Sequence, residues 1–159
     1  MKDGLTGLYN RLGYHEYAIP LYRDLSARGG KLGILFIDLD RLKYLNDLYG
    51  HATGDLAIRC VADVILQGIP QGAVPVRYGG DEFLVLLPDI EPEALRTLPE
   101  SLAASIPARS EELGLPESPG ISTGFVLAEA CGSKSLEEYI KEADQLMYRE
   151  KKAKKAHRQ

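Results

Sequence analysis

A turn of two glycines followed at once by two acids, between two apolar strands, constrains this chain more than any other feature. The segment Arg77–Phe83 reads Arg-Tyr-Gly-Gly-Asp-Glu-Phe, and an apolar run continues to Leu87. Adjacent glycines supply the positive φ that a tight connection needs, so the pattern predicts a hairpin with strands over 74–78 and 82–87. Such a turn needs no function, and acids at a turn are most often simply solvated.

A second acid cluster, Asp38-Leu39-Asp40, ends another apolar strand upstream. Mg²⁺ is typically held by one or two carboxylates while substrate phosphates complete its shell. Asp38, Asp81 and the backbone carbonyl of Leu39 are therefore candidate metal ligands. Two ions about 3.5–4 Å apart could activate a hydroxyl and stabilise the leaving oxygen of a phosphoryl displacement. Glu82 could be a shared ligand or a base, or a solvated hairpin residue, and Asp38 could instead cap the following helix, a role that suits Asp40 better.

The order of the predicted elements indicates an α+β fold. Apolar periodicity predicts helices over 10–27, 41–50, 54–68, 91–106 and after 135, and further strands over 32–37 and 121–127. Pro20 should kink the first helix or begin a second one, and the stretch 110–120 should be a loop. This order is that of the ferredoxin-like split βαβ fold, with antiparallel strands in a central sheet flanked by helices. In that topology Asp38 is expected next to Asp81.

Length and composition set limits on the class of protein. A chain of 159 residues can bury a core as one domain without disulfides, and its net charge of −4 argues against a nucleic-acid-binding surface. Its two cysteines have neither a disulfide framework nor metal-ligand spacing, which indicates a reducing compartment. We find no apolar stretch of membrane-spanning length and no signal peptide, so a cytoplasmic location without direct membrane contact is expected.

The chain resembles the GGDEF domain, the diguanylate cyclase family that joins two GTP molecules into cyclic di-GMP. The segments that carry the resemblance are, in order, Asp3–Arg11, Asp38–Asp47, Gly50-His51, Gly54-Asp55, Gly79–Phe83, Ser122–Gly124, Ala143-Asp144 and Tyr148–Lys151. So many ordered matches are more specific than the Gly-Gly-Asp-Glu-Phe run alone. The resemblance implies a single domain over 1–159 with the palm-like fold of nucleotidyl cyclases. We expect it to come from a longer bacterial signalling protein, which could be anchored in a membrane.

The resemblance implies that Asn46 and Asp55 read guanine. A carboxylate accepts the two N–H donors of the guanine Watson–Crick edge, whereas adenine would leave Asp55 unpaired. Taken alone, Asp55 is better explained as an acid at a helix N-terminus, and Asn46 as the end of a short helix. Gly79 and Gly80 would let the backbone approach the phosphates closely, in addition to forming the turn.

The resemblance implies that three lysines bind phosphate: Lys43, Lys151 and Lys155. The family more often has glycine and arginine where this chain has Lys154 and Lys155, and a lysine lacks the bidentate fork of arginine. The alternatives are a solvated Lys43 and a fraying basic helix end, which describes Lys154 and its neighbours Lys152 and Arg158. Among nearby residues, Arg77 and Asp3 are expected to form an ion pair, and His51 to be packed in a loop.

Many family members carry an Arg-x-x-Asp product-binding motif before the signature, but Pro70 and Ala73 occupy those positions here. Feedback inhibition through that motif is therefore not expected. The working hypothesis is a diguanylate cyclase that uses Mg²⁺, or Mn²⁺, as cofactor and works as a homodimer. Each domain would hold one GTP, two pyrophosphates would be released, and a covalently attached sensor domain outside this chain would enforce pairing.

Several alternatives stay open. The proton acceptor could be Glu82, a hydroxide on the metal or a substrate phosphate. The domain could instead be a GTP-binding regulatory module without turnover, for which the altered pair Lys154-Lys155 leaves room. A cyclase of relaxed base choice is a third hypothesis, and Asp55 argues against it.

Overall fold

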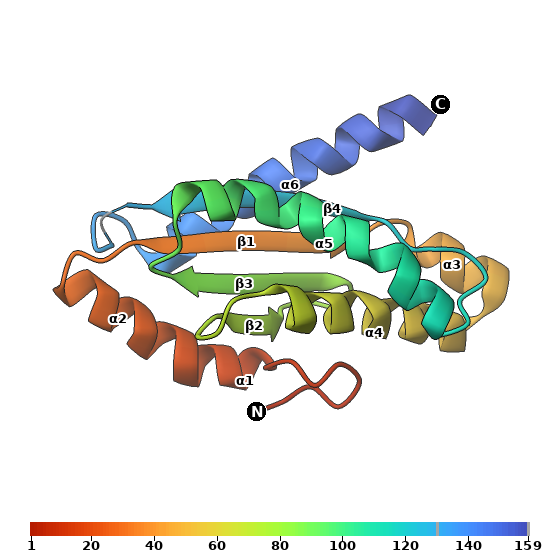
Figure 1. Ribbon diagram of the computed structural model, residues 1–159, viewed down its shortest axis with the longest axis horizontal. Helices are drawn as coiled ribbons and strands as arrows, with labels where there is room; N and C mark the ends of the chain where they lie inside the picture. The colour runs from red at the N-terminus through yellow and green to blue at the C-terminus, as the bar shows by residue number, and fades with distance from the viewer. Residues whose placement is uncertain (130, 159) are drawn as a thin grey trace.

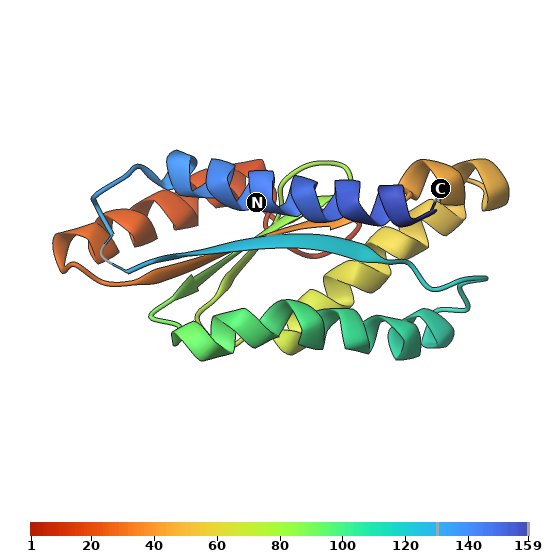
Figure 2. The ribbon, with the colours of Figure 1, turned by 90° about the horizontal axis from the view of Figure 1, so that it is seen from above.

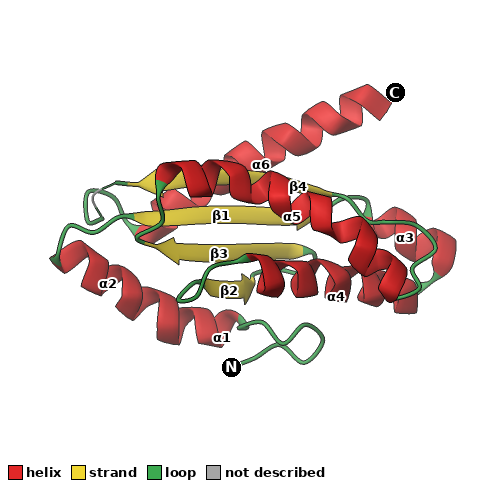
Figure 3. Ribbon diagram, viewed as in Figure 1, coloured by secondary structure: helices red, strands yellow, loops and turns green. Residues whose placement is uncertain are grey.

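The computed structural model describes residues 1–129 and 131–158, and an antiparallel sheet of four strands lies at its centre. The strands are β1 (Leu32–Leu39), β2 (Val74–Arg77), β3 (Glu82–Pro88) and β4 (Ile121–Ala128). Their order across the sheet is β2-β3-β1-β4, and every neighbouring pair is antiparallel (Figures 1 and 3). This is the predicted ferredoxin-like order, so the α+β fold is confirmed.

Helices cover both faces of the sheet (Figure 2). They are α1 (Arg11–Gly13), η1 (Tyr14–Ala18), α2 (Ile19–Ala27), α3 (Leu42–Tyr49), α4 (His51–Gly68), α5 (Pro92–Glu112) and α6 (Leu136–Arg158). One face packs on α4 and α5, and the other on α6 and the N-terminal helices. α3 lies beyond the end of β1, where the chain turns back towards the sheet (Figure 1).

The central strand β1 is buried along its whole length because both of its faces are covered. Leu35 and Ile37 belong to the core on the α4 and α5 side, and Ile34 and Phe36 to the core on the α6 side. An unbroken apolar run is what a strand in this position requires. The apolar stretch that ends at Asp38 therefore identifies the central strand. Its end places the acids in the middle of one end of the sheet.

The predicted helix over 10–27 is divided. Asn10 caps α1 through its side-chain oxygen, which accepts a bond from the Gly13 N–H at 2.9 Å. A π-helical turn, η1, follows, and Pro20 then stands in the first turn of α2. Proline has no N–H to donate and is tolerated in a first helical turn, so Pro20 follows the π-helical interruption of one continuous helical run rather than beginning a separate helix.

The prediction of a loop over 110–120 is wrong at its start, because α5 continues to Glu112. Pro99 and Pro107 both lie inside this helix. Buried side chains on either side of Pro107 hold the helix in place, and the Arg109 guanidinium lies 2.7 Å from the Asp63 carboxylate on α4. Tertiary packing here overrides the local preference of proline.

The final helix begins as predicted. The Glu138 N–H donates to the Ser135 hydroxyl and the Ser135 N–H donates to the Glu138 carboxylate, each at 3.1 Å, which is the reciprocal pattern of a capping box. Within residues 1–129 and 131–158, no helix has the length and hydrophobicity needed to cross a bilayer.

Candidate active site

The acids of the two predicted clusters meet at one edge of the sheet. Asp38 is directly opposite Glu82 in the ladder between β1 and β3, and the Leu39 N–H donates to the Asp81 carbonyl at 2.9 Å. On the other side of β1, Asp38 is opposite Ser122 of β4. The predicted proximity of Asp38 and Asp81 is therefore confirmed, because antiparallel pairing brings the end of β1 to the start of β3.

Burial and charge make Asp38 an unusual carboxylate. Its side chain is 11% exposed, one oxygen lies 2.9 Å from the Lys151 ammonium, and the other, Oδ1, has no hydrogen-bond partner among the described residues. Burial raises the pKa of Asp38 to about 6, with Lys151 opposing this change and Asp81 adding to it. Burial also raises the pKa of Glu82, with contributions from Asp144 and Asp81. Repulsion and desolvation at this edge favour the arrival of a positive charge.

The donor set fits a magnesium ion that shares its shell with substrate. In the part of the chain that the structure describes, no three His, Cys, Asp or Glu side chains gather into a closed metal cage. The candidate oxygen donors are the carboxylates of Asp38 and Asp81 and the Leu39 carbonyl, and the buried Oδ1 of Asp38 is free of hydrogen bonds from described residues. Mg²⁺ commonly uses one or two carboxylates and takes its remaining ligands from water and phosphate.

An open groove of about 570 Å³ runs from α3 and α4 to the glycine turn. Lys43, Asn46, Asp55, Gly80 and Asp81 all line it, which brings five predicted site residues to one surface. Asp55 is exposed in the second turn of α4, whereas Oδ1 of Asn46 is buried and accepts no hydrogen bond from a described residue. The groove is thus lined by an exposed carboxylate and by an asparagine whose buried amide oxygen has no partner among the described residues.

His51 also lines this groove. It is the exposed first residue of α4 rather than a packed loop residue, so that prediction is wrong. Gly50 adopts φ 97° immediately before it, a conformation that glycine reaches without strain, and this ends α3 and starts α4 with no connecting loop.

The predicted phosphate-binding lysines differ in their surroundings. Lys43 is 91% exposed and pairs with Asp47 one turn later at 3.0 Å, and Lys155 is exposed on α6. Lys151 points to Asp38, as described above. Lys154 contradicts the prediction of a fraying helix end: its ammonium lies 2.9 Å from the Asp40 carboxylate and also donates to the Ile121 carbonyl.

The sequence carries a signal for this missed contact. Lys151 and Lys154 are three apart on a helix and therefore share a face, while Asp38 near the end of β1 and Asp40 just after it are two apart, the spacing that puts side chains on one face of an extended chain. Matching these two spacings would have paired the lysines with the acids. The pairing still requires knowledge that α6 crosses the end of β1, which the spacing alone does not supply.

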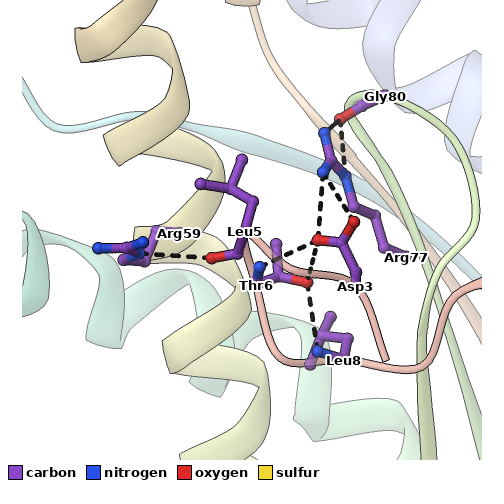
Figure 4. A network of polar contacts seen from close by, with 7 residues as sticks. All are labelled: Asp3, Leu5, Thr6, Leu8, Arg59, Arg77 and Gly80. Atoms are coloured by element: carbon purple, nitrogen blue, oxygen red, sulfur yellow. Dashed lines mark hydrogen bonds and ion pairs between the residues drawn. The ribbon is translucent and has the colours of Figure 1, made fainter. Parts of the chain in front are cut away.

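A network of polar contacts supports the glycine turn from below (Figure 4). The Arg77 guanidinium lies 3.2 Å from the Asp3 carboxylate and donates to the Gly80 carbonyl at 2.8 Å, so the predicted ion pair is confirmed. Burial would raise the pKa of Asp3, but hydrogen bonds from Thr6 and Arg77 outweigh it and hold the pKa below its usual value. The N-terminal segment thereby determines the position of the Gly80 backbone.

Residues 1–157 match the family model described as the diguanylate cyclase, GGDEF domain. The chain belongs to this family. Over 149 residues the GGDEF domain is 34% identical to the diguanylate cyclase DgcM of Escherichia coli, a match that covers 94% of this chain and 35% of DgcM. It is 36% identical over 157 residues to the diguanylate cyclase DgcP of Pseudomonas aeruginosa, covering 96% of this chain and 23% of DgcP. The chain thus spans about a third or less of these curated relatives.

Solved structures agree with this assignment. The GGDEF domain of DgcB from Caulobacter crescentus, in complex with c-di-GMP, is similar with a TM-score of 0.85 and 27% identity, over 96% of this chain and 90% of that chain. The GGDEF domain of TpbB from Pseudomonas aeruginosa is similar with a TM-score of 0.81 and 31% identity, over the same shares of the two chains. The palm-like fold of the cyclase family is therefore shared.

Proposed function

We propose that this GGDEF domain is a diguanylate cyclase that condenses two GTP molecules into cyclic di-GMP and releases two pyrophosphates. The observation that carries the proposal is the meeting of Asp38, Leu39 and Asp81 at one sheet edge, beside a groove that also contains Asn46 and Asp55. Family membership and relatives named as diguanylate cyclases support the same activity.

The groove would hold GTP with its base against α3 and α4. Asp55 would accept the two N–H donors of guanine, and the Asn46 amide would supply a complementary donor and acceptor. The phosphates would then extend towards Gly79 and Gly80, where the backbone of the turn can come close to them. Lys43, Lys151 and Lys155 would offset phosphate charge.

Asp38, Asp81 and the Leu39 carbonyl would hold Mg²⁺, or Mn²⁺ in its place. Bound there, the ion would supply positive charge to the phosphates and stabilise the charge that develops on the leaving oxygen. With Asp38 holding the ion, the Lys151 ammonium would be available to a phosphate oxygen.

Each half of the reaction forms one bond and breaks one. The 3′-oxygen of one GTP bonds to the α-phosphorus of the other, and the bond from that phosphorus to the oxygen of the departing pyrophosphate breaks. The 3′-hydroxyl loses its proton, and we assign Glu82 or a substrate phosphate as the acceptor. The raised pKa of Glu82 makes its carboxylate a stronger base than an ordinary glutamate.

Two domains are required because one groove holds only one of the reacting nucleotides. Pairing would hold each 3′-hydroxyl in line with the other α-phosphate, and this proximity would supply much of the rate. We further propose that a sensor domain outside this chain enforces the pairing, and that the isolated domain is weakly active with a steep dependence on protein concentration.

A second candidate is a GTP-binding regulatory module without turnover. Two observations favour it: Lys155 lacks the fork of an arginine, and Lys151 is engaged by Asp38 rather than turned to the groove. Such a module would bind GTP through the same residues and control an attached domain.

The test is product formation by a forced dimer, made by fusing the domain to a dimeric coiled coil. With GTP and Mg²⁺ we expect the wild-type dimer to form cyclic di-GMP. In Asp81→Ala the rate of product formation should fall roughly 100-fold or more, because a metal ligand is removed. Asp24→Ala is the matched control, since the Asp24 side chain is 72% exposed on α2 and pairs with Arg28. GTP binding without product in the wild-type dimer would favour the regulatory module instead.

A further inference from the structure

The last turns of α6 contain no buried residue among those described, and polar contacts link them to the body of the domain. Met147 is the last buried residue of this helix within the described range, and the helix then projects beyond the sheet (Figure 1). After Met147, Glu150 accepts bonds from the backbone and hydroxyl of Thr123, and Lys151 and Lys154 pair with acids at the end of β1. A helix end without buried apolar contacts depends on such bonds to stay in place.

The two lysine pairs are not equivalent. Asp40 is 8% exposed and both of its oxygens are engaged, one by Lys154 at 2.9 Å and the other by the Ser122 hydroxyl at 2.6 Å. Lys154 has a second acceptor, the Ile121 carbonyl. Asp38 uses only one oxygen, on Lys151, and its Oδ1 accepts nothing from the described residues.

This asymmetry separates a fixed pair from an exchangeable one. In the Asp40 pair, both carboxylate oxygens have a partner within the fold. Breaking this pair would leave a buried carboxylate uncompensated. The Asp38 pair has an unused oxygen beside the candidate metal and phosphate site. A cation and phosphates arriving there can take both partners of the Asp38 pair without touching Asp40.

We propose that Lys154 is a positioning residue for the triphosphate. It anchors the end of α6 through Asp40 and Ile121 while Lys151 leaves Asp38 for a phosphate, and it fixes the position of Lys155, its direct neighbour. This inference rests on the proposed function, because it presumes that GTP binds in the groove. It assigns a structural reason to the lysine that stands where the family more often has glycine.

The experiment measures binding without reaction, using 3′-deoxy-GTP, which lacks the attacking hydroxyl, with Mg²⁺ and the isolated domain. We expect Lys154→Ala to weaken its affinity roughly tenfold, in the range seen when residues that orient ligands are removed. Affinity for GMP, which has no β- or γ-phosphate, should stay within about twofold of wild type, and amide exchange over 148–158 should become faster. Lys154→Arg should restore most of the triphosphate affinity, because arginine can also pair with Asp40.

Lys152→Ala is the matched control, since Lys152 is exposed on the same helix and is expected to leave both affinities unchanged. Because Lys154→Ala leaves Asp40 without its cation, the double variant Asp40→Asn/Lys154→Met removes both charges and keeps the test valid if the single variant unfolds. It too should lose triphosphate affinity and keep GMP affinity.

The outcomes separate this inference from the proposed function. Wild-type affinity for 3′-deoxy-GTP in both Lys154→Ala and Asp40→Asn/Lys154→Met would overturn the positioning role and leave the cyclase proposal standing. An equal loss of GMP and triphosphate affinity would also overturn it, since a general loss of folding would then explain the result. A wild-type domain that binds no 3′-deoxy-GTP would overturn both proposals.

Discussion

A β-carbon on Gly54 would lie 1.7 Å from Oδ1 of Asn46, so the side chain of Asn46 occupies space that only glycine leaves open. Gly54 is buried in the first turn of α4, and Asn46 is in the last turn of α3. Both residues line the candidate nucleotide groove. The close approach of α3 and α4 therefore determines where the Asn46 amide is presented.

Gly54→Ala should weaken GTP binding by displacing Asn46. We expect about a tenfold loss in affinity, the effect of losing one hydrogen bond worth about 1.4 kcal/mol, measured by calorimetry with 3′-deoxy-GTP and Mg²⁺. A double-mutant cycle with Asn46→Ala identifies the cause. If Gly54 acts through Asn46, the double variant binds no more weakly than Asn46→Ala alone.

The control for this prediction is Gly4→Ala, because an added β-carbon at Gly4 meets no atom within 4 Å. It should leave affinity unchanged. Additive losses in the Gly54 and Asn46 variants would contradict the prediction, since they would mean that alanine at position 54 harms binding by another route.

Arg77→Met should displace the glycine turn as well as lower stability. The guanidinium links Asp3 to the Gly80 carbonyl (Figure 4). The Arg77 side chain is about four-fifths buried. Its removal leaves the Asp3 carboxylate with its Thr6 bonds only, and should cost about 1–3 kcal/mol in the free energy of unfolding, measured with urea. Cyclic di-GMP formation by the forced dimer should fall as well, because the turn lines the phosphate end of the groove.

Arg96→Met is the matched control for Arg77, since Arg96 is exposed and pairs only with Glu93 one turn away among the described residues. Surface pairs of this kind contribute little, so stability should change by less than about 0.5 kcal/mol. An Arg77 variant as stable and as active as the Arg96 variant would show that the network is dispensable.

The sequence predicts the acid edge of the sheet because the relevant signals are local. Apolar runs that end in carboxylates mark strand ends, and the order of elements determines which ends meet. Asp38 and Asp81 can therefore be placed together from the sequence alone. The ion pair of Asp3 with Arg77 has no such local signal, because no pattern in the sequence links two residues so far apart in the chain.

The sequence does not predict contacts that depend on how far a helix extends over the sheet. Lys154 reaches Asp40 only because α6 crosses the end of β1 at that turn, and its lysine-rich surroundings suggest a solvated helix end. The extension of α5 past Pro107 likewise depends on packing against α4. In both cases a tertiary contact outweighs the local preference.

The stability of the metal-free domain should depend on the charge of Asp38. Burial holds its folded pKa at about 6, above the ordinary value of 3.8. An acid whose pKa is raised by folding contributes stability below its unfolded pKa, and this is lost as the pH rises through the folded value. In EDTA, the wild type should lose up to about 3 kcal/mol between pH 4 and pH 7.5 relative to Asp38→Asn, because each tenfold difference in proton affinity between the folded and unfolded chain corresponds to about 1.4 kcal/mol.

The measurement is urea unfolding of both proteins at several pH values. Comparing them cancels the titration of groups that they share, so the difference reports on position 38. A difference that stays flat from pH 4 to pH 7.5 would contradict a raised pKa for Asp38. A difference of the opposite sign would mean that the Lys151 ion pair outweighs burial.

The domain should be insensitive to its own product. Pro70 and Ala73 line a hollow near the end of α4, beside Gln71 and Asp89, and their apolar side chains cannot make the charged contacts of the arginine and aspartate in the Arg-x-x-Asp motif. Adding cyclic di-GMP to the forced dimer should leave the initial rate unchanged.

The double substitution Pro70→Arg/Ala73→Asp introduces the charges of the Arg-x-x-Asp motif. It should create binding of cyclic di-GMP, measured by calorimetry on the isolated domain. If cyclic di-GMP inhibits the unsubstituted dimer, and substitutions at these two positions do not abolish the inhibition, the product acts at another surface of the domain.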